Sequence, residues 1–291
     1  MSPPELVEPR TLEEAIAALG QPGAVPLAGA TDLIPAMRRG EVEPRRLVNL
    51  KRISALVGVR RVRKGLHIGA LTPVADLLTS PLIARDCPLM VEVARDFASP
   101  QIRTLATVGG NLCNAAPSAD LALPLLILDA RAEVSGPNGT RLLDFAEFFR
   151  GVHKTALRRG ELLTAIFLPG PPIRTGTAHT KLGIRRAMDL AFVSAAAAIS
   201  LARDGRTCRR ARLALGAVAP VPMRARKAEA LLENQPLTPS LLDQAAAAAS
   251  AEARPISDLR ASAEYRREMV GVLARRVLEA ALREAGKESS Q

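Results

Sequence analysis

The sequence is poor in the residues that build metal clusters, disulfides and base-stacking surfaces. Its 291 residues include three histidines, no tryptophan, 2% aromatic residues and only three cysteines, which are Cys87, Cys113 and Cys208. Widely spaced and odd in number, these cysteines cannot form a disulfide framework, and an iron–sulfur centre needs a group of thiolates. Sparse aromatic residues leave no platform for unpaired bases. We therefore expect no metal site in this chain and no nucleic acid as its partner.

Long apolar runs are also absent. No run reaches the length that crosses a bilayer, and the first residues lack the basic and then apolar pattern of a secretion signal. These absences predict a cytoplasmic protein without a membrane span. The chain length and a hydrophobic fraction of 48% are enough for a full core divided among two or three subdomains.

The net charge is strongly positive, at +11, and the isoelectric point is near 10.6. A basic footprint is expected of proteins that bind RNA or DNA, so a basic nucleic-acid-binding protein stays open as an alternative. The arginines, however, are spread through every segment instead of gathering in one stripe. Docking to an acidic partner, or attraction of an anionic dinucleotide, explains this charge better.

Two glycine turns, far apart in the chain, carry most of the functional information. The first occupies residues 27–32 (LAGATD), and the second opens residues 107–120 (TVGGNLCNAAPSAD). Glycine lets backbone N–H groups approach a ligand closely and lets several of them point at one anion. Neither turn matches the dinucleotide fingerprint Gly-x-Gly-x-x-Gly or a P-loop. Taken singly, each turn is equally well explained as an ordinary connection.

Taken together and in this order, the turns resemble the FAD-binding medium subunit of the molybdenum hydroxylases, the carbon monoxide dehydrogenase and xanthine dehydrogenase family. That family has Ala-Gly-Gly-Thr/His-Asp/Ser, then Thr-Ile/Val-Gly-Gly-Asn with an Ala-x-Pro-x-x-Asp continuation. Similar segments follow at 161–166 (ELLTAI), in the spacing of Lys181, Arg185 and Asp189, and at 215–220 (LGAVAP). The resemblance therefore covers nearly the whole chain.

The resemblance implies an α+β protein with a PCMH-type FAD-binding fold. Two α/β lobes would be followed by a C-terminal domain made of a small antiparallel sheet with a helical cap. We place the N-terminal FAD-binding lobe at 1–55, the second FAD-binding lobe at 56–172 and the C-terminal domain at 173–291. The Pro-Gly-Pro-Pro run at 169–172 marks the clearest boundary, because prolines stiffen a connector and prevent regular structure.

Local signals predict the elements in outline. Thr11 and Glu14 have capping-box spacing and should start a helix, the Pro-Asn-Gly run at 137–139 predicts a hairpin turn, and residues 121–128 should be a buried segment. Further helices are expected at 33–39, 73–79, 87–97, 145–149, 224–233, 239–252 and 262–285. Further strands are expected at 47–50, 57–62, 66–71, 132–134, 162–168, 178–186, 193–203 and 209–217.

By resemblance, FAD would lie with its pyrophosphate between the two turns. One side would be held around Ala28, Gly29, Ala30, Thr31 and Asp32. The other side would be held by Thr107, Gly109, Gly110 and Asn111. Backbone N–H groups would supply the positive partial charge, so no lysine is needed there.

The rest of the cofactor would be reached from later segments. Asn114 and Asp120 fall where the family contacts the ribityl chain or a ribose hydroxyl, and a carboxylate suits hydroxyl recognition because it accepts hydrogen bonds. For Asp120 the alternative is a helix N-cap. Leu162 would lie against the adenine or the flavin, and core packing explains it equally well.

The candidates for direct influence on the flavin ring are Lys181 and Arg185. A cation near the ring stabilises the anionic reduced form and raises its potential. Asp189 would orient one of these cations by ion pairing, and an exposed charge pair of little consequence is the alternative. Of the histidines, we expect His67 on a solvated strand face and a structural or exposed role for His179.

Two departures from the family pattern stand out. Ala30 occupies the position of the second glycine of the first turn, which would cost about 1 kcal/mol if that position needs a positive φ. Residues 100–104 (PQIRT) replace the frequent His-Gln-Ile-Arg-Asn, so contacts from that His and Asn are missing here.

The resemblance implies an electron relay carried by FAD. Electrons from a molybdopterin large subunit would pass through an iron–sulfur small subunit to this FAD and on to NAD, a quinone or dioxygen. A free-standing FAD-dependent dehydrogenase or oxidase is the first alternative, although no convincing substrate base is visible. A structural subunit that no longer holds FAD is a further alternative, suggested only by Ala30.

Overall fold

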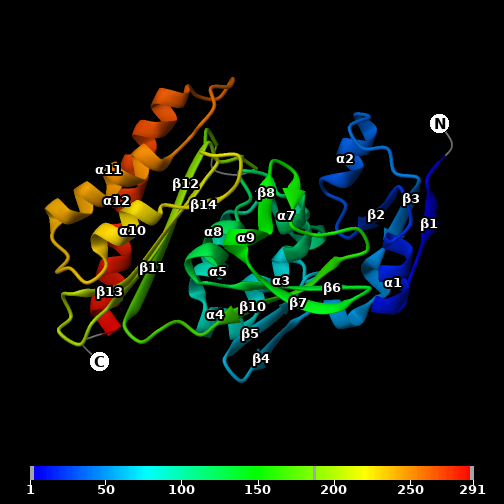
Figure 1. Cartoon of the computed structure of the whole chain (residues 1–291), viewed down its shortest axis with the longest axis horizontal. Helices are drawn as coiled ribbons and strands as arrows, with labels where there is room; N and C mark the ends of the chain where they lie inside the picture. The colour runs from blue at the N-terminus through cyan, green and yellow to red at the C-terminus, as the bar shows by residue number, and fades with distance from the viewer. Residues whose placement is uncertain (1–2, 186–187, 289–291) are drawn as a thin grey trace.

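Three sheets of three or more strands, each with its own helices, follow one another along the chain. The computed structural model describes residues 3–185 and 188–288. The N-terminal and C-terminal parts lie at opposite ends of the molecule, with the middle part between them (Figure 1). Each sheet falls within one of the three ranges expected from the sequence, and the division into domains at those boundaries stays a prediction.

The N-terminal sheet is parallel, with the strand order β1-β3-β2. Its elements are β1 (Glu5–Val7), α1 (Leu12–Leu19), β2 (Ala24–Leu27), α2 (Leu33–Arg38) and β3 (Arg46–Asn49). The capping box is confirmed, because Thr11 accepts from the backbone of Glu14, whose side chain accepts from the backbone of Thr11. The short 3-10 turns η1 (Leu50–Arg52) and η2 (Ser54–Leu56) lead out of this sheet.

The middle sheet is antiparallel, with the order β4-β5-β10-β6-β7. Its strands are β4 (Val59–Val62), β5 (Gly65–Gly69), β6 (Arg131–Gly136), β7 (Gly139–Asp144) and β10 (Leu162–Pro169). The predicted hairpin at 137–139 joins β6 to β7. Between β5 and β6 the chain forms α3 (Val74–Thr79), α4 (Pro81–Asp86), α5 (Pro88–Asp96), α6 (Pro100–Leu105), α7 (Val108–Asn114) and α8 (Ala122–Ile127). After β7 come α9 (Phe145–Phe148) and the small hairpin of β8 (Phe149–Gly151) and β9 (Lys154–Thr155).

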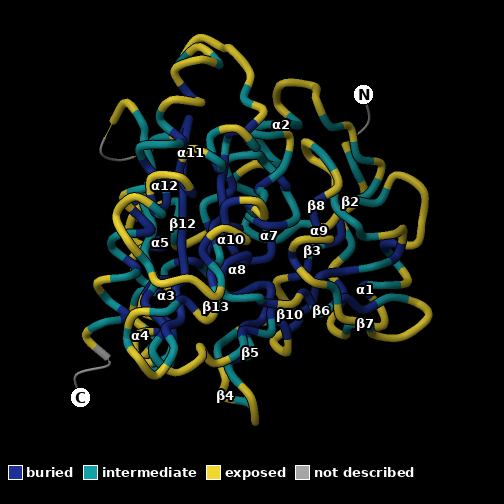
Figure 2. The backbone as a smooth tube through the Cα atoms, turned by 60° about the vertical axis from the view of Figure 1, so that its left-hand side comes forward, coloured by how far each residue is buried: buried dark blue, intermediate teal, exposed yellow. Residues whose placement is uncertain are grey.

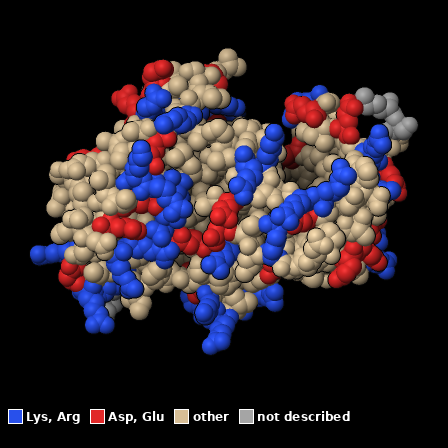
Figure 3. Space-filling view, in the orientation of Figure 1, with Lys and Arg blue, Asp and Glu red and all other residues tan. Residues whose placement is uncertain are grey.

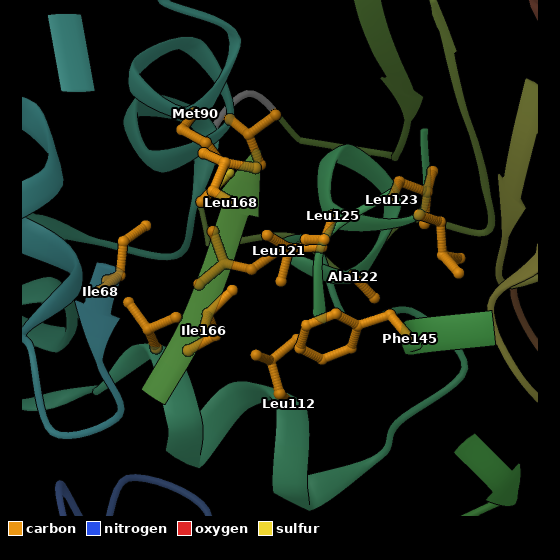
Figure 4. Packing of buried hydrophobic residues seen from close by; sticks show 14 of the residues in the cluster. Ile68, Met90, Leu112, Leu121, Ala122, Leu123, Leu125, Phe145, Ile166 and Leu168 are labelled. Carbon is orange, nitrogen blue, oxygen red and sulfur yellow. The ribbon is translucent and has the colours of Figure 1, made fainter. Parts of the chain in front are cut away.

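The middle core joins the strands to α8. Ile166 and Leu168 of β10 lie in one cluster with Leu121, Leu125 and Phe145 (Figure 4). All five side chains are 3% exposed or less. The segment predicted to be buried at 121–128 is therefore the helix that anchors the sheet, because residues on every side of it are apolar.

The C-terminal sheet is antiparallel, with the order β11-β12-β13-β14. Its elements are β11 (Thr175–Leu182), β12 (Val193–Leu201), β13 (Cys208–Gly216), β14 (Met223–Arg224), α10 (Arg226–Leu232), α11 (Pro239–Glu252) and α12 (Ala263–Glu288). The helices cover the face turned away from the middle sheet (Figure 1). All of β12 is buried (Figure 2), since its alanines let helices pack closely on both of its faces. We call the contact between the other sheet face and the middle part the domain seam.

Some local expectations were wrong. The helix predicted at 87–97 is α5 alone, preceded by α4, because Cys87 breaks the helical backbone before Pro88. The second glycine turn is the start of α7 instead of a loop. His67 is 13% exposed at its side chain instead of lying on a solvated face, because Arg60 on the neighbouring strand covers it and donates to its ring from 3.2 Å.

Candidate functional site

The two glycine turns form opposite walls of one cleft of about 220 Å³. The first wall is the loop after β2, and the second runs from the end of α6 into α7. The walls touch at Gly29, where an added Cβ would lie 2.1 Å from the carbonyl oxygen of Leu105. Only glycine permits this approach of two backbones. The residues predicted to face each other across a ligand are thus brought together by the fold.

The first wall offers unpaired backbone donors. Within residues 3–185 and 188–288, no acceptor is paired with the backbone N–H of any residue from 29 to 33. Every one of these residues lines the cleft. Consecutive N–H groups of this kind form an anion-binding concavity, and unpaired donors are stable only where water or a ligand can reach them.

Ala30 adopts the left-handed conformation inside this wall, with φ of +62°. The sequence indicated a cost if this position needs a positive φ, and the structure shows that it does. A non-glycine residue in this region costs about 1–2 kcal/mol. The loop therefore holds a conformation that glycine adopts more easily than alanine, at some cost in stability.

The second wall is braced from within. Thr107 caps α7 by accepting from the N–H of Gly110 at 3.0 Å, and the N–H of Asn111 donates to the carbonyl of Thr107. The N–H of Gly109 donates to Ala70 at 2.7 Å, and an added Cβ there would meet Ala70 at the same distance. Gly109 therefore packs α7 against the end of β5 and does not line the cleft, unlike Thr107, Gly110 and Asn111.

Side-chain amides supply the polar groups of the second wall. Asn111 accepts from the backbone of Leu121 at 3.3 Å through Oδ1, which leaves its Nδ2 without an acceptor in the described part of the chain. The side chain of Asn114, also on the cleft, has no hydrogen bond to the described residues. Cys113 lines the cleft as an inert thiol, because burial raises its pKa to about 12.

His153 is a neighbour of the cleft that the sequence did not reveal. Its backbone N–H donates to Ala115 at 3.0 Å, and its Nδ1 lies 2.8 Å from the carbonyl oxygen of Asn114. The β8–β9 hairpin is thereby fixed to the last turn of α7. Desolvation raises the pKa of Asp32 on the opposite wall, and the charge of His153 acts against that rise. An isolated histidine in the sequence gave no signal of this placement.

Asp120 and Lys181 meet across the domain seam beyond α7. Lys181 Nζ lies 3.4 Å from both carboxylate oxygens of Asp120 and donates to the carbonyl of Asp96 at 2.6 Å. Burial raises the pKa of Asp120 to about 6, although Lys181 opposes the rise. Asp120 is not a helix cap, because α8 starts after Leu121 and has no side-chain cap.

The remaining predicted residues lie elsewhere. Arg185 is 69% exposed and bonds to Asp189 through its backbone N–H at 2.7 Å, so this pair is separate from Lys181. Leu162 packs in the small core with Leu50 and Leu71 and does not line the cleft. His179 is half-buried on β11 of the C-terminal sheet, where desolvation lowers its pKa to about 4.

The described residues contain no group of histidine, cysteine and carboxylate side chains that could hold a metal ion. No helix among them is both long and apolar enough to pass through a bilayer. The arrangement that remains is a cleft with one wall of unpaired N–H groups, a second wall that bears side-chain amides, and a largely buried ion pair beyond it. Such a site can hold a phosphorylated cofactor, and it has no arranged nucleophile or metal of its own.

Two family models match the chain. The model of the FAD binding domain in molybdopterin dehydrogenase matches residues 3–171, and that of the CO dehydrogenase flavoprotein C-terminal domain matches residues 178–281. Together they span both walls of the cleft and the C-terminal sheet.

Relatives match over nearly their full length. The carbon monoxide dehydrogenase medium chain of Afipia carboxidovorans is 39% identical, covering 94% of each chain. The xanthine dehydrogenase FAD-binding subunit of Escherichia coli O157:H7 is 35% identical, covering 95% of each. Among solved structures, a chain of the Cu,Mo-CO dehydrogenase superposes with a TM-score of 0.92 at 37% identity, covering 98% of this chain and 100% of that one. A chain of quinoline 2-oxidoreductase from Pseudomonas putida superposes with a TM-score of 0.91 at 28% identity, covering 98% of this chain and 99% of that one.

Proposed function

The chain belongs to the FAD-binding medium subunits of the molybdenum hydroxylases, a family of oxidoreductases, and we propose that its cleft holds FAD for electron transfer between a partner subunit and an external acceptor. FAD is the cofactor of this family's domain.

The observation that carries the proposal is the row of unpaired N–H groups at residues 29–33. A pyrophosphate carries two negative charges and needs several donors at once, which such a row supplies without a lysine. The second wall, whose N–H groups at residues 108–111 are already used, supports the cofactor by shape and through the free amides of Asn111 and Asn114. The donor set of this cleft therefore fits FAD.

The residues of the seam would act on the rest of the cofactor. When bound, FAD takes up two electrons and releases them to an acceptor. We propose that Asp120 accepts hydrogen bonds from hydroxyl groups of the cofactor, and that Lys181 brings a positive charge toward the flavin ring. Their ion pair fixes both side chains before the cofactor arrives. Arg185, exposed beside Asp189, would act only at the edge of this site.

We propose that the electrons come from another chain, because no group of side chains among the described residues could hold a metal cluster. Members of this family are medium subunits of multi-subunit enzymes. We propose an iron–sulfur small subunit as the direct donor, a molybdopterin large subunit behind it, and NAD, a quinone or dioxygen as the acceptor. Three cysteines without disulfides fit a reducing compartment, so we propose a cytoplasmic location.

The test is flavin content. The purified chain is incubated with FAD and desalted, and the bound flavin per chain is measured from the absorption spectrum. The same measurement is made on the complex that co-purifies with the chain. Gly110→Asp should abolish retention, because its Cβ would lie 2.8 Å from Thr107 Oγ1 and its charge would face the pyrophosphate. Gly170→Asp adds the same side chain where no atom lies within 4 Å and should retain FAD. Normal flavin content in Gly110→Asp would contradict the two-wall site.

A further inference from the structure

A second and larger pocket opens at the domain seam, away from the FAD cleft. It has a volume of about 460 Å³, and no residue lines both it and the cleft. Its walls come from the end of β10, the segment after α8, the proline-rich connector at 169–172 and the strands β11 to β13. We call it the seam pocket. Ligands bind preferentially where two domains meet, because both can contribute groups.

The rim of the seam pocket is basic. Its lining carries the cations Lys64, Arg131, Arg210 and Arg212 and a single acid, Asp129. Lys64 has no ion-pair partner within residues 3–185 and 188–288. On the face shown in Figure 3, Lys and Arg also gather over the region of α10, β13 and β14. Arg131 pairs with Asp144 at 3.1 Å and Arg212 with Glu233 at 2.9 Å, so the excess positive charge that favours an anion comes chiefly from Lys64 and Arg210.

Donors in this pocket remain unused. Arg210 contacts Asp129, but its Nε is buried and has no hydrogen-bond partner in the described part of the chain. Arg212 Nε also donates to Asp129 Oδ1 at 3.3 Å, so the guanidinium groups of Arg210 and Arg212 compete for one carboxylate. Nη1 of Arg210 and Nη2 of Arg212 also have no hydrogen-bond partner in the described part of the chain, and an anion in the pocket would accept hydrogen bonds from them.

The floor of the pocket is apolar. Leu128, Phe167 and Ala198 contribute hydrocarbon surface, and prolines of the connector close one side. The hydroxyls of Thr175 and Ser200, 2.7 Å apart, bond to each other. A basic rim over an apolar floor suits a ligand with an anionic group at one end and a hydrocarbon body at the other.

We propose that the seam pocket binds a small organic anion, a carboxylate or phosphate attached to an apolar body. The anionic oxygens lie among Lys64, Arg210 and Arg212, and the apolar body lies on Phe167 and the connector. Lys64 belongs to the middle part and the two arginines to the C-terminal sheet, so the ligand bridges the two and stabilises the folded chain by mass action. This site is independent of FAD.

Benzoate and benzamide form a matched pair of probes, since they share a ring and differ in charge. Differential scanning calorimetry of the FAD-loaded full chain should show a saturable rise in Tm with benzoate and none with benzamide. Inorganic phosphate should give a smaller rise, since it cannot use the floor. Lys64→Gln should lower the affinity for benzoate about tenfold, as the loss of one charged hydrogen bond predicts. Arg159→Gln removes an exposed charge outside the pocket and should change nothing.

The proposal would be overturned if benzamide or phosphate raised Tm as much as benzoate does. It would also be overturned if Lys64→Gln bound benzoate with unchanged affinity. Arg210→Gln is the second variant, and benzoate affinity should fall there too. Flavin absorbance per chain is recorded in every sample. The cleft and the seam pocket share no residue, so the two outcomes can be told apart. Normal flavin content without benzoate binding would reject the ligand site in the seam pocket and leave FAD binding intact. Missing flavin would count only against FAD binding in the cleft.

Discussion

Lys181 and Asp120 form an ion pair across the domain seam, with Lys181 Nζ 3.4 Å from each carboxylate oxygen. Their side chains are only 15% and 14% exposed. The same ammonium group holds the carbonyl oxygen of Asp96 at the end of α5. One cation on β11 is therefore bound to two segments of the middle part, so the pair fixes how the C-terminal sheet meets the FAD-binding lobe.

Asp120 makes stability depend on pH. Its pKa is raised to about 6 by burial, above the usual 3.8. The folded state then binds more protons than the unfolded state between these values, so this carboxyl's contribution to stability falls as pH rises through that window. We expect the free energy of unfolding of Asp120→Asn, relative to the parent, to rise by on the order of 2 kcal/mol from pH 4 to pH 7. Urea denaturation at several pH values measures this, and parallel pH profiles would contradict it.

Lys181→Met should destabilise the chain and lower the flavin potential. Removing one partner of a buried pair leaves the other charge uncompensated, at a cost of about 3 kcal/mol. The double variant with Asp120→Asn should recover most of that loss. Bound flavin should remain, and its midpoint potential should fall, because a cation favours the reduced form. Spectroelectrochemical titration measures the shift.

Arg185→Met is the matched control for Lys181→Met. Its guanidinium is exposed and its partner Asp189 lies close in sequence, so stability should change by less than about 1 kcal/mol. A Lys181→Met potential equal to that of the parent would show that Lys181 acts only as a structural tie between the two domains.

Ala30→Gly should stabilise the chain by about 0.5–1 kcal/mol, because glycine adopts a positive φ without the steric cost that alanine pays. FAD should be retained at least as well, since the loop keeps its shape. Ala217→Gly is the control, because Ala217 has the same φ of 62° outside the cleft and should give a similar gain without any effect on FAD. Thermal unfolding measures the change in stability, and FAD titration measures the change in FAD affinity. Loss of stability in Ala30→Gly alone would show that its methyl group has a packing role.

Local chemistry explains what the sequence could predict. Thr11 and Glu14 cap α1, and Asn138 with Gly139 turns the β6–β7 hairpin, because each signal acts within a few residues. The second glycine turn was expected as a connection between elements, since glycine most often makes turns. It is helical because the N–H groups of Val108 and Gly109 are held by the segment after β5, a contact distant in sequence.

The sequence predicted the parts of the site that lie within its two glycine motifs, but not the contacts between residues distant in the chain. Both turns were found, and their contact at Gly29 was not, because it depends on the position of Leu105 in α6. The pairing of Asp120 with Lys181 joins residues 61 positions apart, and no local pattern encodes it. His153 reaches α7 through a small hairpin, which the isolated histidine in the sequence could not indicate.

Gly29→Ala tests whether the two walls must touch. The added methyl group would lie 2.1 Å from Leu105 O and 3.0 Å from the Cα of Ala106, both backbone atoms that cannot rotate away. The loop must therefore move off α6, at a cost of about 1–3 kcal/mol, as overpacking predicts. Because the unpaired N–H groups of residues 29–33 move with it, FAD affinity should fall at least about tenfold. Gly170→Ala adds a methyl group where no atom lies within 4 Å and should leave stability and FAD binding unchanged. Equilibrium dialysis with FAD and thermal unfolding provide both readouts. If Gly29→Ala loses stability but keeps full FAD affinity, the first wall does not hold the pyrophosphate, and the anion must be bound by the second wall.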